Sequence, residues 1–200
     1  NLGLGYRKLS DNKLLLTGIN AFYDHEFPYD HGRTSLGVEA RTSMWELSAN
    51  KYWATTDWET GRQGKQERAL DGFDVEAGVA IPYMNWATLY VNHFEWDAYD
   101  GNVDPEGQKV SFRALFPGEL TGLEVEAGRT LYTATGYEDE NFVKVSYNLT
   151  QLFNKKAKTT KWVSDVAYKL ESMEERRFEK VRRNNTIVKQ IKFTAKAKGV

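Results

Sequence analysis

Residues 73–83 alternate between two kinds of side chain, and this alternation constrains the fold most. One set is apolar, and four of the five residues between its members are Asp74, Glu76, Gly78 and Ala80; the apolar set is Phe73, Val75, Ala77, Val79, Ile81 and Tyr83. A period of two sends successive side chains to opposite faces of a strand, whereas an amphipathic helix repeats every three or four residues. The segment is therefore a β-strand with one apolar and one polar face.

Similar alternation recurs along the chain at regular intervals. It predicts strands near residues 2–7, 15–23, 35–41, 45–49, 86–97, 109–116, 123–128 and 143–149. Short turns join these strands in pairs, and longer polar stretches such as residues 59–71 and 99–107 separate the pairs. We count nine strands up to Leu149 and at least one more in the tail, which predicts an all-β, antiparallel, up-and-down sheet of about ten strands.

Composition leaves two kinds of β-protein open. A chain of 200 residues without a Pro/Gly/Ser-rich linker fits one domain, and its mean hydropathy is −0.63. No window approaches the roughly 18 apolar residues of a membrane-spanning helix. A low average does not exclude a membrane β-barrel, because only every second residue of each strand faces lipid. A soluble β-domain and an outer-membrane barrel both remain.

The two faces of the strands favour the barrel. The polar faces carry Gly, Ser and charges of both signs, whereas the apolar faces carry Leu, Val, Ala and aromatic residues. The six Trp and eleven Tyr gather near predicted strand ends, and short turns alternate with long connections. Outer-membrane barrels combine apolar residues towards lipid, a polar interior, aromatic girdles, and short turns at one rim with long loops at the other. We therefore expect a transmembrane barrel.

The tail differs from the body in charge. Residues 1–153 carry 13 basic and 23 acidic side chains, whereas residues 154–200 carry 14 and 5. A basic tail can bind nucleic acid, but a solvated linker is the commoner explanation, and we expect no nucleic-acid partner. Within residues 162–173, apolar residues at helical spacing predict a short helix: Val163, Val166, Ala167 and Leu170.

Several longer motifs resemble one known family. They are NLGLGYR, GINAFYDHE, HGRTSLGVEART, LSANKYW, ALDGFDVEAGVAIPYMNWATLYVNHFEWD, FVKVSYNL and KVRRNNTIV, which together span nearly the whole chain. These segments closely resemble the β-domain of the intimin/invasin family, the inverse autotransporters. The resemblance implies a twelve-stranded barrel in the outer membrane of a Gram-negative bacterium. Such a barrel exports its own C-terminal adhesin passenger, and the linker to the passenger threads back through the pore.

The resemblance also implies an organisation and partners. Residues 1–185 would form the barrel without the family's first two strands, and residues 186–200 would be the end of a closing strand or a basic linker towards a passenger. The chain is then either an excised part of a longer protein or a reduced family member. Expected partners are outer-membrane lipid and lipopolysaccharide, the barrel-assembly machinery, the passenger itself and, through the passenger, a host-cell receptor.

The polar faces become the pore lining once the apolar faces are assigned to lipid. The expected lining residues are Arg7, Glu39, Arg41, Glu46, Asp74, Glu76, Arg113, Glu124, Glu126 and Lys144. Neighbouring strands could pair Arg113 with Glu124 or Glu126, and Lys144 with Glu126. The structural interpretation is that such ladders rigidify a wet barrel. The functional hypothesis is that an acidic lining holds a basic linker as a plug, through Lys189, Lys192, Lys196 and Lys198.

Two further classes of function fit parts of the sequence. A passenger-less barrel would act as a pore or through its surface loops, and an outer-membrane enzyme would use Asp24 with His25, or Asp30 with His31. Adjacent strand residues point to opposite faces, so we expect these pairs to be polar rim residues and expect no enzyme. His25, His31 and His93 lack the spacing of metal ligands and the chain has no cysteine. We expect neither a metal nor a cofactor.

Overall fold

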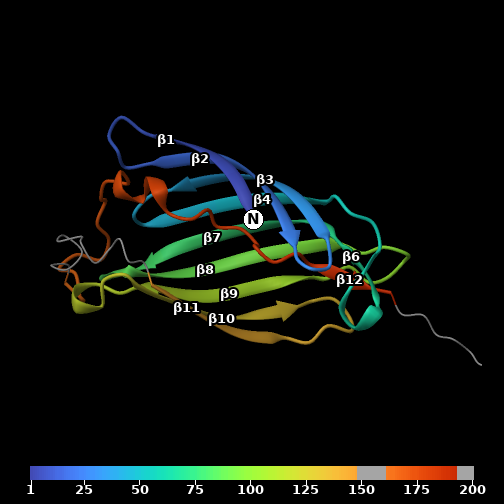
Figure 1. The fold of residues 1–200 in the computed structure, drawn as a ribbon. Helices are drawn as coiled ribbons and strands as arrows, with labels where there is room; N and C mark the ends of the chain where they lie inside the picture. Colours follow the sequence, from blue (N-terminus) through green and yellow to red (C-terminus); the bar gives the residue numbers. More distant parts are fainter. Residues whose placement is uncertain (148–160, 193–200) are drawn as a thin grey trace, which may run out of the picture.

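The main feature of the computed structural model is one antiparallel sheet that curls into an open barrel around the C-terminal part of the chain (Figure 1). The structure describes residues 1–147 and 161–192. Each strand of the main sheet pairs with its neighbours in chain order, antiparallel throughout. The nine strands are β1 (Leu2–Leu9), β2 (Leu16–Glu26), β3 (His31–Arg41), β4 (Trp45–Ala54), β7 (Asp71–Ile81), β8 (Met84–Asp97), β9 (Glu106–Leu115), β10 (Leu123–Tyr132) and β11 (Glu140–Tyr147).

A second, small sheet lies at one rim of the barrel. It consists of β5 (Glu59–Thr60), β6 (Gln66–Ala69) and β12 (Lys189–Ile191), in the order β12–β6–β5. The expected up-and-down architecture is thus confirmed, with nine strands in the main sheet of the described residues where the sequence predicts about ten. The tail strand β12 pairs with β6 and not with β1 or β11.

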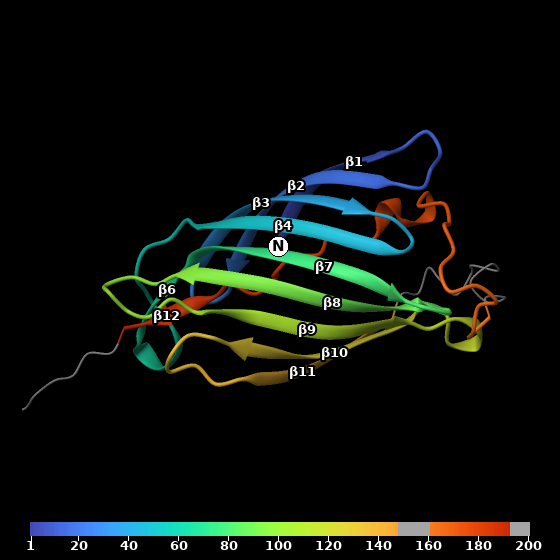
Figure 2. The ribbon, with the colours of Figure 1, turned by 180° about the vertical axis from the view of Figure 1, so that it is seen from behind.

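The two rims differ in the length of their connections. One rim carries the turns between β1 and β2, β3 and β4, β7 and β8, and β9 and β10, the last containing the 3₁₀ turn Gly118–Leu120. The other rim carries residues 55–70, 98–105 and 133–139, together with one short turn at residues 27–30. We refer to these as the turn rim and the loop rim. Figure 2 shows the strands running between them on the convex side of the sheet.

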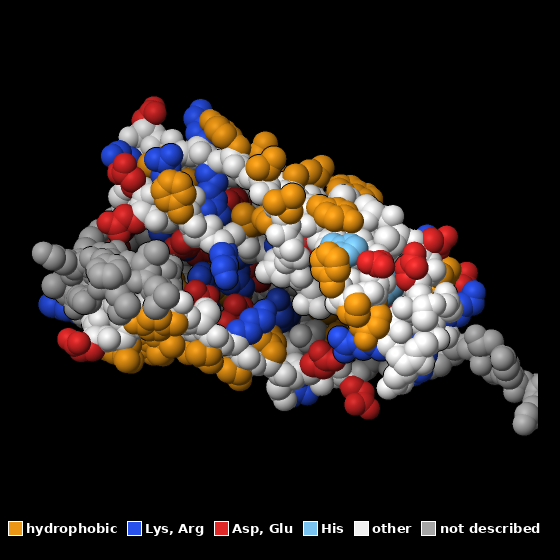
Figure 3. Space-filling model, in the orientation of Figure 1, with side chains coloured by type: hydrophobic (Ala, Val, Ile, Leu, Met, Phe, Trp, Pro, Cys, Tyr) orange, Lys and Arg blue, Asp and Glu red, His pale blue; other side chains and the backbone are white. Residues whose placement is uncertain are grey.

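The sheet has its apolar face outside and its charged face inside, the reverse of a soluble β-domain. Leu4 is 83% exposed and Val143 is 70% exposed, whereas Arg33 on the inner face is fully buried. In Figure 3 groups of apolar side chains lie along the outer surface of this face, and charged side chains gather in the hollow. This inversion is typical of a barrel whose outer face meets lipid and whose interior is polar. No helix in residues 1–147 and 161–192 is long and apolar enough to cross a membrane.

The predicted helix at residues 162–173 is wrong. The segment is irregular, and its backbone groups find partners in the strand turns instead of four residues away in the segment itself. Tyr83 of the β7–β8 turn accepts a hydrogen bond from the Ser164 amide (2.8 Å) and donates one to the Ala167 carbonyl (2.9 Å). Ser43 of the β3–β4 turn donates to the Lys169 carbonyl (2.8 Å). The segment therefore runs as a strap across the turn rim, and its apolar side chains, Val163, Val166 and Leu170, stay largely exposed.

Candidate functional site

The candidate site is the barrel interior, through which residues 174–188 run from the turn rim to the loop rim. In Figure 1 this segment passes, in orange to red, between β1–β4 and β8–β11 before it reaches β12. It begins with the 3₁₀ turn Glu175–Phe178 and is extended beyond it. We call residues 174–188 the lumen segment. An interior cavity of about 1560 Å³ remains beside it, lined mainly by β7–β11 and the segment itself.

The barrel wall presents buried carboxylates to this segment because the polar residues of each strand share its inner face. The ten residues expected to line the pore all lie on this face: Arg7 on β1, Glu39 and Arg41 on β3, Glu46 on β4, Asp74 and Glu76 on β7, Arg113 on β9, Glu124 and Glu126 on β10, and Lys144 on β11. Five of the acids are less than 10% exposed. A buried carboxylate needs a charged or hydrogen-bonding partner.

Arginine side chains of the lumen segment supply these partners. Arg182 forms a bidentate pair with Glu76 and also lies 3.0 Å from Glu126 Oε1. Its guanidinium stacks on the Tyr90 ring, 3.7 Å from the ring centre. Arg183 pairs with both carboxylate oxygens of Asp24. Bidentate pairs of this kind are stronger and more directional than single contacts between charges.

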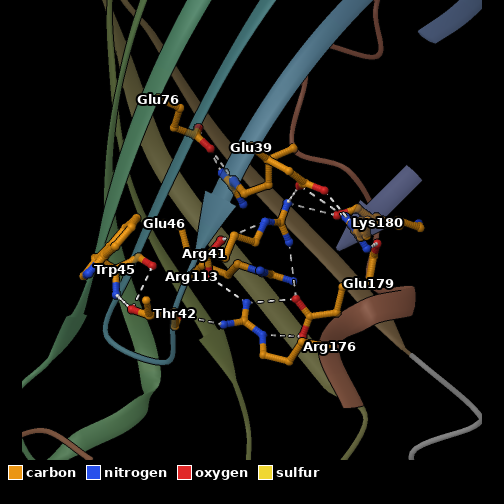
Figure 4. A network of polar contacts seen from close by, with 12 residues as sticks. Glu39, Arg41, Thr42, Trp45, Glu46, Glu76, Arg113, Arg176, Glu179 and Lys180 are labelled. Carbon is orange, nitrogen blue, oxygen red and sulfur yellow. Dashed lines mark hydrogen bonds and ion pairs between the residues drawn. The ribbon is translucent and has the colours of Figure 1, made fainter. Parts of the chain in front are cut away.

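A third arginine holds the start of the lumen segment at the turn rim. Arg176 donates to Glu46 Oε1 (2.6 Å) and to both carboxylate oxygens of Glu179 (2.8 Å each). Glu179 in turn lies 3.5 Å from the Arg41 guanidinium. Figure 4 shows how these side chains converge from β3, β4 and the segment. Wall and segment thus contribute charges of both signs to one connected network.

Wall donors bind the backbone of the lumen segment as well. Arg7 donates to the carbonyls of residues 177 (2.8 Å) and 179 (2.6 Å). Arg33, held by Asp24, donates to the carbonyls of residues 184 (2.7 Å) and 186 (3.1 Å). Tyr52 accepts the amide of residue 184 (2.8 Å) and donates its own hydroxyl proton to Asp74 (2.6 Å). Contacts to the backbone would form with any residue other than proline at these positions of the lumen segment. The ion pairs of Arg182 and Arg183 require an arginine side chain.

An apolar cluster lies in the interior near the loop rim. Tyr52, Leu70, Phe94 and Trp96 form it, and Val188 packs against it at the end of the lumen segment. The Leu70 amide donates to the Val188 carbonyl (2.9 Å), so the chain leaves the interior already paired with the wall.

Of the ion pairs expected between lining residues, within the described part of the chain the one between Arg113 and Glu124 forms, and the one between Lys144 and Glu126 does not. Arg113 donates to both oxygens of Glu124 (2.8 and 3.0 Å), which is one of the two pairings that the sequence leaves open. Lys144 lies opposite Glu126 in the β10–β11 register, but among the described residues it contacts the Phe142 ring and forms no ion pair. Glu126 is bound by Arg182 and Ser111 instead.

Two of the four expected plug residues, Lys189 and Lys192, lie at the loop rim. Lys189 binds Glu26 and Glu67, and Lys192 lies 4.0 Å from Asp100 near the Trp58 ring. Lys196 and Lys198 lie outside the described residues. The interior contacts come from Arg176, Arg182 and Arg183, which sequence reasoning did not assign. The run of basic residues from 176 to 183 was the available signal, although it has no alternation that would place it.

Among the described residues, Asp24 pairs with arginines and its side chain does not contact that of its neighbour His25. Together with Arg33 and Arg183 it forms a buried charged trio on the inner face. His25 lies on the other side of β2 and contacts Phe27 and Asp30. The alternation of β2 already separates Asp24 from His25, and the structure shows Asp24 engaged by two arginines.

Comparison with known proteins agrees with this architecture. The family model for the inverse autotransporter β-domain matches residues 1–185. A putative attaching and effacing protein homolog of Escherichia coli K12 is 33% identical over 84 residues, 41% of this chain and 28% of that protein. The inverse autotransporter adhesin YeeJ of the same strain is 29% identical over 100 residues, 47% of this chain and 4% of YeeJ.

Two further similarities complete the comparison. Invasin of Yersinia enterocolitica is 29% identical over 86 residues, 42% of this chain and 10% of invasin. The chain thus spans only a small part of these relatives. A solved structure from work on the in-meso crystallization of membrane proteins shares the fold, with a TM-score of 0.69 and 20% identity over 95% of this chain and 79% of the other. The match over residues 1–185 shows that the chain belongs to the inverse autotransporter β-domain family.

Proposed function

We propose that this chain is the outer-membrane translocator barrel of an adhesin, which exports a C-terminal passenger and then anchors it with the lumen segment in the pore. One observation carries the proposal: residues 174–192 run from the turn rim to the loop rim inside the sheet, held by pairs such as Arg182–Glu76 and Arg183–Asp24. A segment so placed connects the barrel to any domain attached beyond the loop rim. The apolar outer face and the family support an outer-membrane location.

The interior limits how a passenger could cross. The cavity beside the lumen segment is about 1560 Å³, which leaves room for an extended chain. A folded domain does not fit, so the passenger crosses unfolded. Folding outside would remove chain from the pore and so drive export. Lipid and lipopolysaccharide around the barrel, the barrel-assembly machinery, and a host receptor bound through the passenger are the partners that this function requires.

Pore occupancy can be tested by conductance. The protein is reconstituted in planar bilayers, and deletion of residues 174–200 is compared with deletion of residues 193–200. We expect the longer deletion to raise single-channel conductance several-fold, because it removes the lumen segment. The shorter deletion is the control and leaves conductance near that of the parent. Equal conductance of the parent and the longer deletion would exclude a plug.

Export needs a separate readout. An epitope fused after Val200 should become accessible to antibody on intact cells when the barrel exports the polypeptide attached to its C-terminal end. A buried epitope together with a normally folded barrel would favour the alternative, a barrel that works without a passenger.

A further inference from the structure

The ammonium group of Lys189 occupies a built pocket at the loop rim. Its Nζ lies 2.7 Å from Glu67 Oε2 and 2.9 Å from Glu26 Oε2, and 5.7 Å from the centre of the Tyr29 ring. His31 lies behind, fully buried, with Nε2 3.4 Å from Glu67. We call Glu26, Tyr29, His31 and Glu67 the Lys189 pocket. It combines side chains from β2, the β2–β3 turn, β3 and β6.

The loop before β6 is shaped to hold Glu67 in this pocket. The Arg62 amide donates to Glu67 Oε1 (3.0 Å), which leaves Oε2 for Lys189. A Cβ on Gly61 would lie 2.1 Å from the carboxyl carbon of Glu67, so only glycine allows this approach. Burial disfavours the charge on both partners, but hydrogen bonds between them lower the pKa of Glu67 and raise that of Lys189 from their ordinary values.

The backbone hydrogen bonds between β12 and β6 do not by themselves determine the register of the two strands. Lys189 pairs with Ala69 and Ile191 with Glu67, through main-chain groups that every residue except proline offers. A slip of one residue would turn the side chains of β12 to the other face. A slip of two would keep the faces and the ladder. Side-chain contacts must therefore favour the observed register over registers shifted by two residues in either direction.

Lys189 makes that distinction by its charge, since its ammonium group lies between Glu26 and Glu67. Among the described residues that follow Asn184, those sharing one face of an extended strand are Asn185, Ile187, Lys189 and Ile191, and Lys189 is the charged residue of this set. Lys192 falls on the opposite face. Moving the strand by two residues either way would put an isoleucine between the half-buried carboxylate of Glu26 and the buried carboxylate of Glu67. A buried carboxylate without a cation is strongly disfavoured.

We propose that the Lys189 pocket is a lysine-binding register stop, which fixes how far the exit strand moves along β6. The inference rests on the proposed function, in that a chain moving outward through the barrel would halt where the pocket binds the Lys189 ammonium group. Lys189 is thus a positioning residue for the anchored state. The ligand of the pocket is a primary ammonium carried by an extended strand.

Cysteine cross-linking reads the register directly, since the chain contains no native cysteine. Gln190 faces Arg68, so Arg68→Cys with Gln190→Cys reports the observed register under a short bis-thiol reagent. Combining Lys189→Gln with Ile191→Lys moves the lysine two residues along. Binding of residue 191 in the pocket leaves two more residues of chain inside the barrel, so the lumen segment is not stretched. We expect the cross-link to move to Arg68→Cys with Lys192→Cys.

The outcomes separate the two proposals. If the lysine-shifted variant still cross-links at 68 and 190, or at neither pair, the register stop is overturned. Lys192→Gln is the control and should leave the 68–190 cross-link unchanged, because Lys192 does not enter the pocket. If the parent lacks the 68–190 cross-link and conducts like the deletion of residues 174–200, the lumen is empty, and the proposed function fails before the register is tested.

Discussion

Arg182 of the lumen segment and Glu76 of β7 face each other in a bidentate ion pair whose side chains are 14% and 6% exposed. The pair joins residues 106 positions apart in the sequence and fixes the segment to the wall at mid-strand. Glu126 completes the arrangement from β10. One guanidinium thus binds two carboxylates that belong to different strands.

Arg182→Ala should destabilise the barrel and open its interior. The substitution leaves Glu76 and Glu126 buried without their cation, and breaking a buried pair in this way costs about 3–5 kcal/mol. Denaturation in detergent measures the loss, and conductance measures the opening. Arg177→Ala is the matched control, since in the described residues Arg177 binds no carboxylate through its side chain. Equal effects of the two substitutions would contradict the assignment.

Tyr52→Phe should loosen the lumen segment without altering its charges. The hydroxyl accepts the amide of residue 184 and donates to Asp74, so its loss leaves two buried groups short of a partner, at about 1–3 kcal/mol. Thermal denaturation and hydrogen exchange at the Asn184 amide report the effect. Tyr6→Phe, on the exposed outer face, is the control and should leave both unchanged.

Gly78→Ala should destabilise the barrel, although it adds only one methyl group. Its Cβ would lie 2.3 Å from the Tyr90 ring, and that ring supports the Arg182 guanidinium. Overpacking of this kind costs about 1–3 kcal/mol. Gly5→Ala is the comparison, because its Cβ would make ordinary contacts at 3.6 Å or more. A smaller effect at Gly78 than at Gly5, measured by denaturation, would argue against this packing.

The β6–β12 ladder should weaken at both extremes of pH. Because the pKa of Glu67 is lowered, its contribution is complete above the ordinary glutamate value of about 4.3 and is lost as pH falls through the value in the folded state. The pKa of Lys189 is raised, so its contribution is complete below about 10.4 and is lost as pH rises through its folded value.

Hydrogen exchange at the amides of Leu70 and Lys192, which bond across this ladder, would report the loss of pairing. Glu26 and His31 face the same ammonium and carboxylate, so the Glu67→Gln variant isolates the contribution of Glu67. The acidic loss should be smaller in Glu67→Gln than in the parent. If the loss of protection at low pH were the same in Glu67→Gln as in the parent, another group would be responsible for it.

Alternation predicted the sheet well because it depends on backbone geometry alone. The faces of β7 and β10 are those expected, and Glu76 and Glu126 point inward as their positions require. The helix failed because Ser43 and Tyr83, far away in sequence, bind the backbone of residues 164–171. Helical spacing in one segment carries no information about such distant partners.

The inner contacts of the tail could not be predicted for a related reason. Arg182 and Arg183 are adjacent, yet one reaches β7 and β10 and the other reaches β2. A segment surrounded by wall on several sides has no single buried face, so its sequence shows no period. Lys189 was recognised as basic, but its partners Glu26 and Glu67 lie in elements that meet only in the folded barrel.

The number of strands in the main sheet has a consequence for its two free edges. Nine strands that reverse direction at every step leave β1 and β11 pointing the same way. Joining these edges directly would place one parallel seam in an otherwise antiparallel wall. An antiparallel seam requires an odd number of further strands between β11 and β1, whichever polypeptide contributes those strands. In lipid the barrel must close in some way, because an unpaired edge leaves its amides and carbonyls without partners.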